Sequence, residues 1–177
     1  MLIRHPRLLS EPGICYGRLD ILPHPDAVAE TARAAVTAAA GLDGPAIWSS
    51  PARRCLAVAE ALGPKPALDQ RLLELHFGAW EGVAWDEVDR ASLDLWAASP
   101  LDFAPPGGES GASLVDRVRS FHATLRALGR DCVVVSHGGP LKVLRSLLAG
   151  EAVDLLTPPP ALGSVTSMRA FTAPPED

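Results

Sequence analysis

Residues 132–139 read Cys-Val-Val-Val-Ser-His-Gly-Gly, and this stretch decides the fold class. Its unbroken run of β-branched residues predicts a strand buried on both faces, as in a parallel sheet. Pro140 suits the start of the helix that follows. That helix directs four leucines inward, at Leu141, Leu144, Leu147 and Leu148. A buried strand that runs directly into an amphipathic helix is typical of an α/β protein.

The same alternation of strand and helix recurs along the chain. Strands are expected at residues 2–3 and 46–49, and an edge strand within 163–171. Helices are expected over 26–40, from Ser50 with Pro51 at the first position, over 85–97, and from Ser113 with Asp116 in a capping box. We therefore expect a single domain over residues 1–177, a three-layer α/β/α sandwich with a mainly parallel central sheet. Ligands of such folds bind at the carboxyl ends of the strands.

The composition is that of a soluble globular protein, with 47% apolar and 21% charged residues. The formal net charge of −5 argues against a nucleic-acid binder, because such proteins usually display a basic surface. No stretch approaches the ~20 apolar residues that a membrane span requires. The three cysteines, Cys15, Cys55 and Cys132, lack the spacing of a disulfide framework or a zinc site. These features favour reduced thiols in a cytoplasmic protein.

Polar side chains follow three of the predicted strands. The segments are Arg4-His5 after the first, Ser49-Ser50 leading to Arg54 after the second, and Ser136-His137 after the strand quoted above. If those strands are parallel neighbours, two imidazoles and two guanidinium groups meet at one edge of the sheet. The first N–H groups of the helix after His137 would also favour an anion there. The sequence therefore predicts a pocket for a small dianion.

Five segments, in order, resemble the histidine phosphatase superfamily, which has the phosphoglycerate-mutase-like fold. The matching segments are Arg4-His5, residues 49–54 (Ser-Ser-Pro-Ala-Arg-Arg), 72–82 (Leu-Leu-Glu-Leu-His-Phe-Gly-Ala-Trp-Glu-Gly), 106–110 (Pro-Gly-Gly-Glu-Ser) and 135–139 (Val-Ser-His-Gly-Gly). The resemblance covers nearly the whole chain. It implies a phosphatase that acts on a small-molecule phosphate ester and needs neither a metal nor another cofactor.

The resemblance also implies a role for each matched residue. His5 would be the nucleophile, attacking phosphorus as a neutral imidazole while its other ring nitrogen donates to a backbone carbonyl. The non-bridging oxygens would be surrounded by Arg4, Arg54 and His137. Glu74 would protonate the departing alkoxide and then activate water against the phosphohistidine.

Other residues near these segments have plainer expected roles. Glu81 is a second carboxylate in the same segment, and geometry must decide between it and Glu74. His76 is expected to point away from the site, and Arg53 to face away from the pocket that Arg54 enters. Three tryptophans are expected to pack in the interior rather than to stack on substrate: Trp80, Trp85 and Trp96.

The chain departs from the family pattern directly after the first motif. The family continues as Gly-Glu-Thr, with an Asn a few residues later that helps to bind phosphate. Here residues 6–10 read Pro-Arg-Leu-Leu-Ser, and the chain contains no Asn. Arg7 and Ser10 are candidates to replace that phosphate contact. Further on, residues 15–20 (Cys-Tyr-Gly-Arg-Leu-Asp) resemble the branch assigned as α-ribazole-5′-phosphate phosphatase, which acts late in cobalamin assembly.

Three functions follow from these patterns. The first is a phosphomonoesterase for a small metabolite, with α-ribazole 5′-phosphate as the leading named substrate. The second, a phosphoglycerate-type mutase, is disfavoured because residues 74–109 leave little room for the insertions of family mutases. The third is a non-catalytic anion-binding or regulatory protein, suggested by the altered Pro6-Arg7 loop. No nucleic-acid or membrane partner is expected, and a homodimer stays open.

Overall fold

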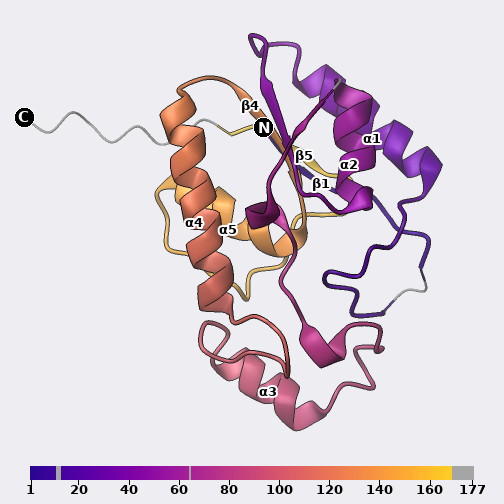
Figure 1. Cartoon of the computed structure of the whole chain (residues 1–177), viewed down its shortest axis with the longest axis vertical. Helices are drawn as coiled ribbons and strands as arrows, with labels where there is room; N and C mark the ends of the chain where they lie inside the picture. Colours follow the sequence, from indigo (N-terminus) through magenta and orange to yellow (C-terminus); the bar gives the residue numbers. More distant parts are fainter. Residues whose placement is uncertain (11–12, 64, 169–177) are drawn as a thin grey trace, which may run out of the picture.

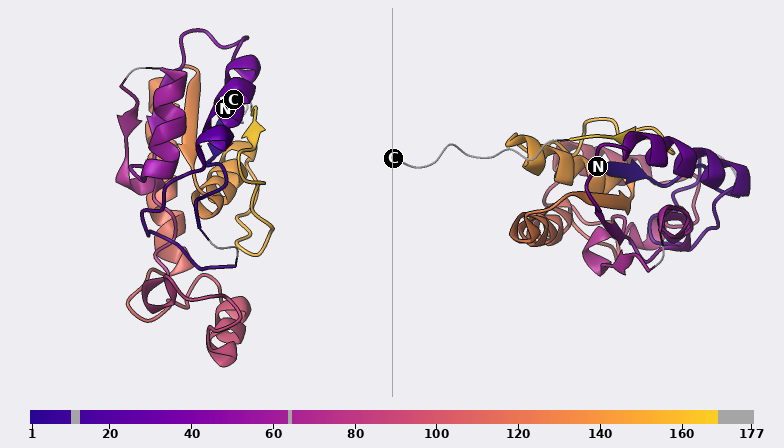
Figure 2. Two further views of the ribbon diagram at one scale, coloured as in Figure 1. Left: turned by 90° about the vertical axis from the view of Figure 1, so that its right-hand side faces the viewer. Right: turned by 90° about the horizontal axis from the view of Figure 1, so that it is seen from above.

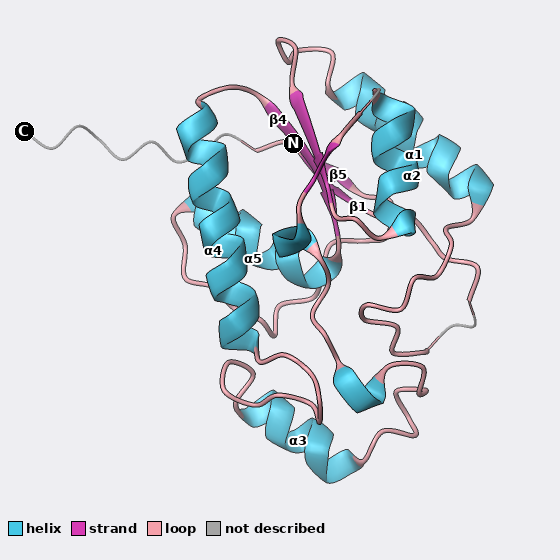
Figure 3. Cartoon of the chain, viewed as in Figure 1, coloured by secondary structure: helices cyan, strands magenta, loops and turns pink. Residues whose placement is uncertain are grey.

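The computed structural model describes residues 1–10, 13–63 and 65–168, which contain a five-stranded sheet (Figure 3). Its strands are β1 (Leu2–Arg4), β2 (Ala46–Ser49), β3 (Ala67–Leu68), β4 (Cys132–Ser136) and β5 (Val165–Thr166). They lie in the order β3-β2-β4-β1-β5, and every neighbouring pair is parallel except β1 and β5. The mainly parallel sheet expected from the sequence is confirmed. The short strand β3 was not foreseen.

The register of the three central strands sets the position of the polar segments. Arg4 of β1 lies opposite Ser136 of β4, and Ser49 of β2 lies opposite Val135 of β4. The carboxyl ends of these strands are therefore level with one another. Because His5 and His137 follow directly, the two rings meet at one edge of the sheet, with centroids 5.2 Å apart.

Helices cover both faces of the sheet and complete the three layers (Figure 1). The helices α1 (Pro25–Ala38) and α2 (Arg53–Leu62) lie on one face, and α4 (Gly111–Leu128) and α5 (Gly138–Ala149) on the other. Successive side chains of β4 point to opposite faces of the sheet, and this explains why the helices form two groups. Val134 packs with α4 and α5, while Val133 and Val135 pack with α1 and α2. The three-layer sandwich is confirmed.

The remaining α-helix, α3 (Arg90–Ala98), lies at the end of the molecule away from the sheet, as Figure 2 shows from a second side. It packs on a small hydrophobic core around Trp80. This core includes Trp85, Trp96 and Phe103. The loop that returns from α3 is tied back at Gly78, which has φ +55° and no room for a side chain beside the Pro106 carbonyl oxygen. Ala79 donates its N–H to that same oxygen at 2.8 Å. Residues 105–108 are therefore a packed turn rather than a linker.

Three predicted helix starts were wrong. The helix expected from Ser50 begins at Arg53, because the Ser50 hydroxyl instead meets His137 Nε2 at 2.7 Å. The helix expected from Ser113 begins at Gly111, because the Ser110 side chain accepts the N–H of Ser113 and caps that end. The helix expected over 85–97 begins at Arg90, where Asp89 caps it by accepting the Ser92 N–H at 2.8 Å.

Two further expectations were met in part. The helix expected over 26–40 spans Pro25–Ala38, with Ala27, Thr31, Ala32 and Ala35 buried but Val36 57% exposed. The last strand forms at the sheet edge over Val165–Thr166, and residues 169–171 of the expected range lie outside the described residues. Within the described residues, no helix is both long and apolar enough to cross a membrane.

Candidate active site

The imidazole of His5 has the geometry of a nucleophile. Its ring is fully buried after β1, and Nδ1 lies 2.9 Å from the carbonyl oxygen of Pro6. Because a carbonyl can only accept, Nδ1 carries the proton and the lone pair of Nε2 is free. Among the described residues, Nε2 has no hydrogen-bond partner. Burial, with smaller contributions from the Arg54 and Arg4 charges, lowers the pKa of His5 to about 3, so the ring is neutral near pH 7.

The low pKa of His5 makes the stability of the protein depend on pH. An unfolded chain protonates histidine near pH 6.5, so between that pH and about 3 the unfolded state binds one more proton than the folded state. The free energy of unfolding therefore falls as the pH is lowered through this window, by up to about 1.4 kcal/mol per pH unit for this residue. We expect His5→Asn to have a correspondingly shallower slope in urea unfolding between about pH 4 and 6. The same slope in both proteins would contradict the assigned pKa.

Arg54 and His137 form a buried, hydrogen-bonded pair beside His5. The Arg54 guanidinium donates to the carbonyl oxygens of Leu19 and Gly17, both at 2.6 Å, and its Nε–H donates to His137 Nδ1 at 3.2 Å. His137 must then carry its proton on Nε2, which donates to the Ser50 hydroxyl. Burial, and then the Arg54 charge, lower the pKa of His137 well below its usual range. Of the five N–H groups of a guanidinium, two remain on Arg54 to bind an anion.

Arg53 and Arg54 point in different directions, as expected for adjacent residues at the start of a helix. Arg54 is fully buried, whereas Arg53 turns outward and binds Asp20 at the surface, with Nε 2.7 Å from the carboxylate. Asp20 belongs to the same 15–20 segment whose carbonyls hold Arg54. This segment therefore fixes both arginines, one on each side.

Tyr16 is a site residue that the sequence analysis did not single out. Its ring lies edge-on to His5, with centroids 5.9 Å apart, and Arg54 Cζ lies 5.2 Å from the centre of the same ring. Arg4 completes this side of the site; it donates to the carbonyl of Pro160, while its Nε has no partner among the described residues. The only signal in the sequence was a lone Tyr inside the segment at residues 15–20.

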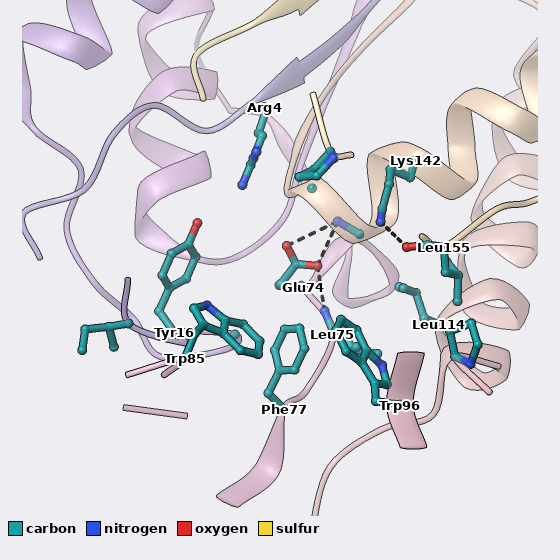
Figure 4. A pocket seen from close by; sticks show the side chains of 16 residues that line it. Arg4, Tyr16, Glu74, Leu75, Phe77, Trp85, Trp96, Leu114, Lys142 and Leu155 are labelled. Atoms are coloured by element: carbon teal, nitrogen blue, oxygen red, sulfur yellow. Dashed lines mark hydrogen bonds between the residues drawn. The ribbon is translucent and has the colours of Figure 1, made fainter. Parts of the chain in front are cut away.

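The carboxylate of Glu74 lies at the start of α5 and faces the pocket (Figure 4). Its Oε1 accepts the backbone N–H groups of Leu75 at 2.9 Å and Gly139 at 3.1 Å. The Gly139 N–H, expected from the sequence to favour a bound anion, is therefore taken by the protein's own carboxylate. Oε2 has only a longer contact with the same N–H, at 3.4 Å.

Two arginines that the sequence analysis did not name hold the backbone at Glu74. The carbonyl oxygen of Glu74 accepts from Arg18 Nε and from an Arg117 terminal nitrogen, both at 3.1 Å. Glu109 binds both arginines in turn, at 3.1 Å and 2.7 Å. Glu109 and Arg117 are distant from Glu74 in the sequence, so no local sequence pattern predicts that these side chains meet.

The structure separates Glu74 from its competitor Glu81. Oε1 of Glu81 accepts the backbone N–H groups of Arg18 and Phe77, each at 3.0 Å, and its side chain is 9% exposed. Glu81 does not line the pocket that Glu74 faces. His76 is half-buried and lies 3.9 Å from Glu81, outside that lining as well. The geometry places Glu74, and not Glu81, where a substrate could bind.

Arg7 and Ser10 are not brought to His5. Both are exposed, and Arg7 lines a separate surface pocket with Glu30 and Thr31 of α1. Within the described residues, the side-chain hydrogen bonds of Arg4, His5 and Arg54 go to other partners and not to Arg7 or Ser10. The expectation that one of them replaces the family's Asn stays a prediction, because both side chains are exposed and Arg7 lines another pocket.

A pocket of about 290 Å³ opens beside this cluster (Figure 4). Arg4, Tyr16 and Glu74 line it, together with Lys142 of α5. The rest of the lining is largely apolar and includes three aromatic rings: Phe77, Trp85 and Trp96. The expectation of packing holds for Trp80, which is buried, but Trp85 and Trp96 also face the pocket.

Comparison with known proteins adds a family and several relatives. The family model described as "Histidine phosphatase superfamily (branch 1)" matches residues 1–172. Glucosyl-3-phosphoglycerate phosphatase of Mycolicibacterium vanbaalenii is 37% identical over 123 residues, and phosphoserine phosphatase 1 of Hydrogenobacter thermophilus is 34% identical over 118 residues. These alignments cover 61% and 62% of this chain and 55% of each relative, so the chain matches about half the length of either protein.

A solved structure is similar over almost the whole chain. The crystal structure of TTHB049 from Thermus thermophilus is 31% identical, with a TM-score of 0.71, and the match covers 97% of this chain and 95% of that one. Sequence and fold therefore agree on one family.

Proposed function

The chain belongs to the histidine phosphatase superfamily, and from that membership we propose that it is a phosphomonoester hydrolase acting through a phosphohistidine at His5. One observation carries the proposal. The neutral ring of His5 has its Nδ1 on the Pro6 carbonyl and its Nε2 unpartnered among the described residues, and it lies close enough to Arg54 and Arg4 for both charges to lower its pKa. A binding protein for phosphate would need the cations but not a nitrogen lone pair directed at the same place.

In the first step, the lone pair of His5 Nε2 forms a bond to phosphorus while the bond from phosphorus to the ester oxygen breaks. The free N–H groups of Arg4 and Arg54 bind the non-bridging oxygens and stabilise their charge. Glu74 gives its proton to the departing alkoxide. We assign that proton to Oε2, because Oε1 already accepts two backbone N–H groups.

In the second step, the Glu74 carboxylate takes a proton from water, whose oxygen attacks phosphorus as the bond to Nε2 breaks. The products are inorganic phosphate, neutral His5 and protonated Glu74, which completes the cycle. His137 orients Arg54 and would contact the phosphoryl group only after its Nε2–H leaves Ser50. Two guanidinium groups provide the positive charge, so we propose that the reaction needs no metal.

The substrate we propose is a small phosphorylated metabolite. The relatives above carry the names of phosphoserine and glucosyl-3-phosphoglycerate phosphatases. The segment at residues 15–20 resembles the α-ribazole-5′-phosphate phosphatase branch, but none of the three proteins compared above carries that name. All three esters therefore belong in the same assay.

The test is turnover of these esters by the wild-type protein in excess chelator. We expect release of inorganic phosphate from at least one ester at a rate that chelator does not change. Quenching with alkaline detergent during turnover of a ³²P-labelled ester should trap labelled protein whose phosphate is stable to base and is lost on later treatment with acid. Hydrolysis of none of the esters would favour the non-catalytic anion-binding protein. Activity that chelator abolishes would refute the metal-independent mechanism.

A further inference from the structure

The pocket beside the phosphoryl site has an aromatic wall, formed by Phe77, Trp85 and Trp96. Trp85 and Trp96 are stacked, with centroids 6.4 Å apart and an angle of 16° between the rings, and Phe77 lies edge-on to both. Leu75 and Leu114 extend the same lining. In Figure 4, Trp85 lies beside Tyr16, Phe77 lies next to it below Glu74, and Trp96 lies on the side of Leu114.

Few charged side chains line the pocket and could bind a charged group on the alcohol part of the ester. Arg4 lies on the phosphoryl side, and the Glu74 carboxylate is held by backbone N–H groups. Lys142 is the remaining charged side chain in the lining, and its ammonium donates to the carbonyl of Leu155. An α-ammonium group would therefore find Glu74 as the only carboxylate among the described lining residues, and binding there would compete with the role of Glu74 as proton donor.

We infer that the substrate of this pocket is a phosphate ester whose alcohol carries a flat, uncharged and largely apolar ring system, which packs against Phe77, Trp85 and Trp96. This inference rests on the proposed function, because it concerns the leaving group of the same reaction. Aromatic side chains pack well against another flat ring, either face to face with an offset or edge to face. The volume of about 290 Å³ lies at the small end of the range for ligand pockets, which suits a single ring system close to the phosphate.

The first arm of the test compares esters of primary alcohols in the wild-type protein. The aromatic esters are benzyl phosphate and 2-naphthylmethyl phosphate; the others are ethyl phosphate, phosphoserine and 3-phosphoglycerate. We expect kcat/KM for 2-naphthylmethyl phosphate to exceed that for ethyl phosphate and phosphoserine by about 10- to 100-fold. If phosphoserine or 3-phosphoglycerate is the best ester, the inference is wrong. Hydrolysis of none refutes the proposed function, and the inference with it.

The second arm removes part of the wall on α3. Trp96→Gln should lower kcat/KM for 2-naphthylmethyl phosphate about 10-fold or more and leave ethyl phosphate nearly unchanged. Leu95→Gln is the matched control, because Leu95 is the preceding residue on α3, is 60% exposed and does not line the pocket. That variant should keep both rates. Trp96→Phe retains a flat apolar surface and should retain most of the preference.

Loss of folding can be told apart from loss of the wall within the same assay. A misfolded Trp96→Gln protein loses the ethyl phosphate activity together with the aromatic activity, and Trp85→Gln then serves as the second wall variant. Equal losses on both esters in a protein that melts like the wild type would overturn the inference. An unchanged preference in Trp96→Gln and Trp85→Gln would overturn it as well.

Discussion

Replacing His5 with Asn will lower kcat at least about 10⁴-fold for every ester that the wild-type protein hydrolyses, because the bond to phosphorus has no other nucleophile. Asn is small enough for the space of the ring and can still donate to the Pro6 carbonyl. The loss therefore reports the missing Nε2 lone pair rather than a collapsed site. The measurement is steady-state turnover together with trapping of labelled protein by an alkaline detergent quench. The variant should form no base-stable phosphoenzyme.

The matched control for this variant is His122→Asn. His122 lies on α4, outside the pocket lining and outside the contacts of His5, and its substitution should leave turnover and trapping unchanged. A phosphoenzyme that persists in His5→Asn would assign the phosphorylated residue elsewhere. A loss of less than about 10-fold would mean that the rate of the reaction does not depend on this nitrogen.

Glu74→Gln will slow the hydrolysis of alkyl phosphates about 10²- to 10⁴-fold, because a poor leaving group depends on a proton from a general acid. The amide oxygen of Gln can still accept the N–H groups of Leu75 and Gly139, so the segment keeps its place. With 4-nitrophenyl phosphate, whose leaving group needs no proton, the first step should stay fast. The second step still lacks its base. We therefore expect a burst of about one 4-nitrophenolate per protein, followed by slow turnover.

Glu81→Gln controls for a general effect of losing a carboxylate in this segment. Glu81 binds the backbone N–H groups of Arg18 and Phe77, so its substitution should lower stability without changing how the rate depends on the leaving group. If Glu81→Gln gave the burst and Glu74→Gln did not, the roles of the two residues would have to be exchanged. Equal loss from Glu74→Gln on alkyl and aryl esters, without a burst, would contradict its role as the acid.

The strands at residues 46–49 and 132–136 could be predicted to the residue, because short runs of apolar and β-branched residues favour a strand, although only the second is largely buried. The helix starts could not, because they depend on contacts with distant residues. Ser50 has the side chain of a good cap, yet its hydroxyl binds His137, which lies 87 positions further along the chain. Local patterns rank the candidate caps, and tertiary contacts decide between them.

The candidate site divides in the same way. The placement of Arg4, His5, Arg54 and His137 could be predicted, because each lies at or just after a parallel strand whose end is level with the others. Tyr16 and Arg18 could not be predicted, because the loop from residue 13 to 24 takes its path from contacts with Arg54, Val83 and Glu81. Arg7 and Ser10 were candidates because a cation and a hydroxyl close to His5 in the sequence could replace the family's Asn, and that role stays a prediction, since both side chains are exposed.

The two tryptophans of the aromatic wall and the phosphoryl site belong to separate parts of the chain, whereas Phe77 lies in the same segment as Glu74. The ends of β1 and β4 and the start of α2 hold Arg4, His5, His137 and Arg54, to which we assign roles at phosphorus, whereas Trp85 and Trp96 lie on or beside α3 and pack around Trp80. Substitutions in the wall can therefore change which alcohol fits while the chemistry at phosphorus continues. During evolution, a protein of this kind could exchange one substrate for another through variants that each remain active. Such independence gives a physical reason why one superfamily contains enzymes named for phosphoserine and for glucosyl-3-phosphoglycerate.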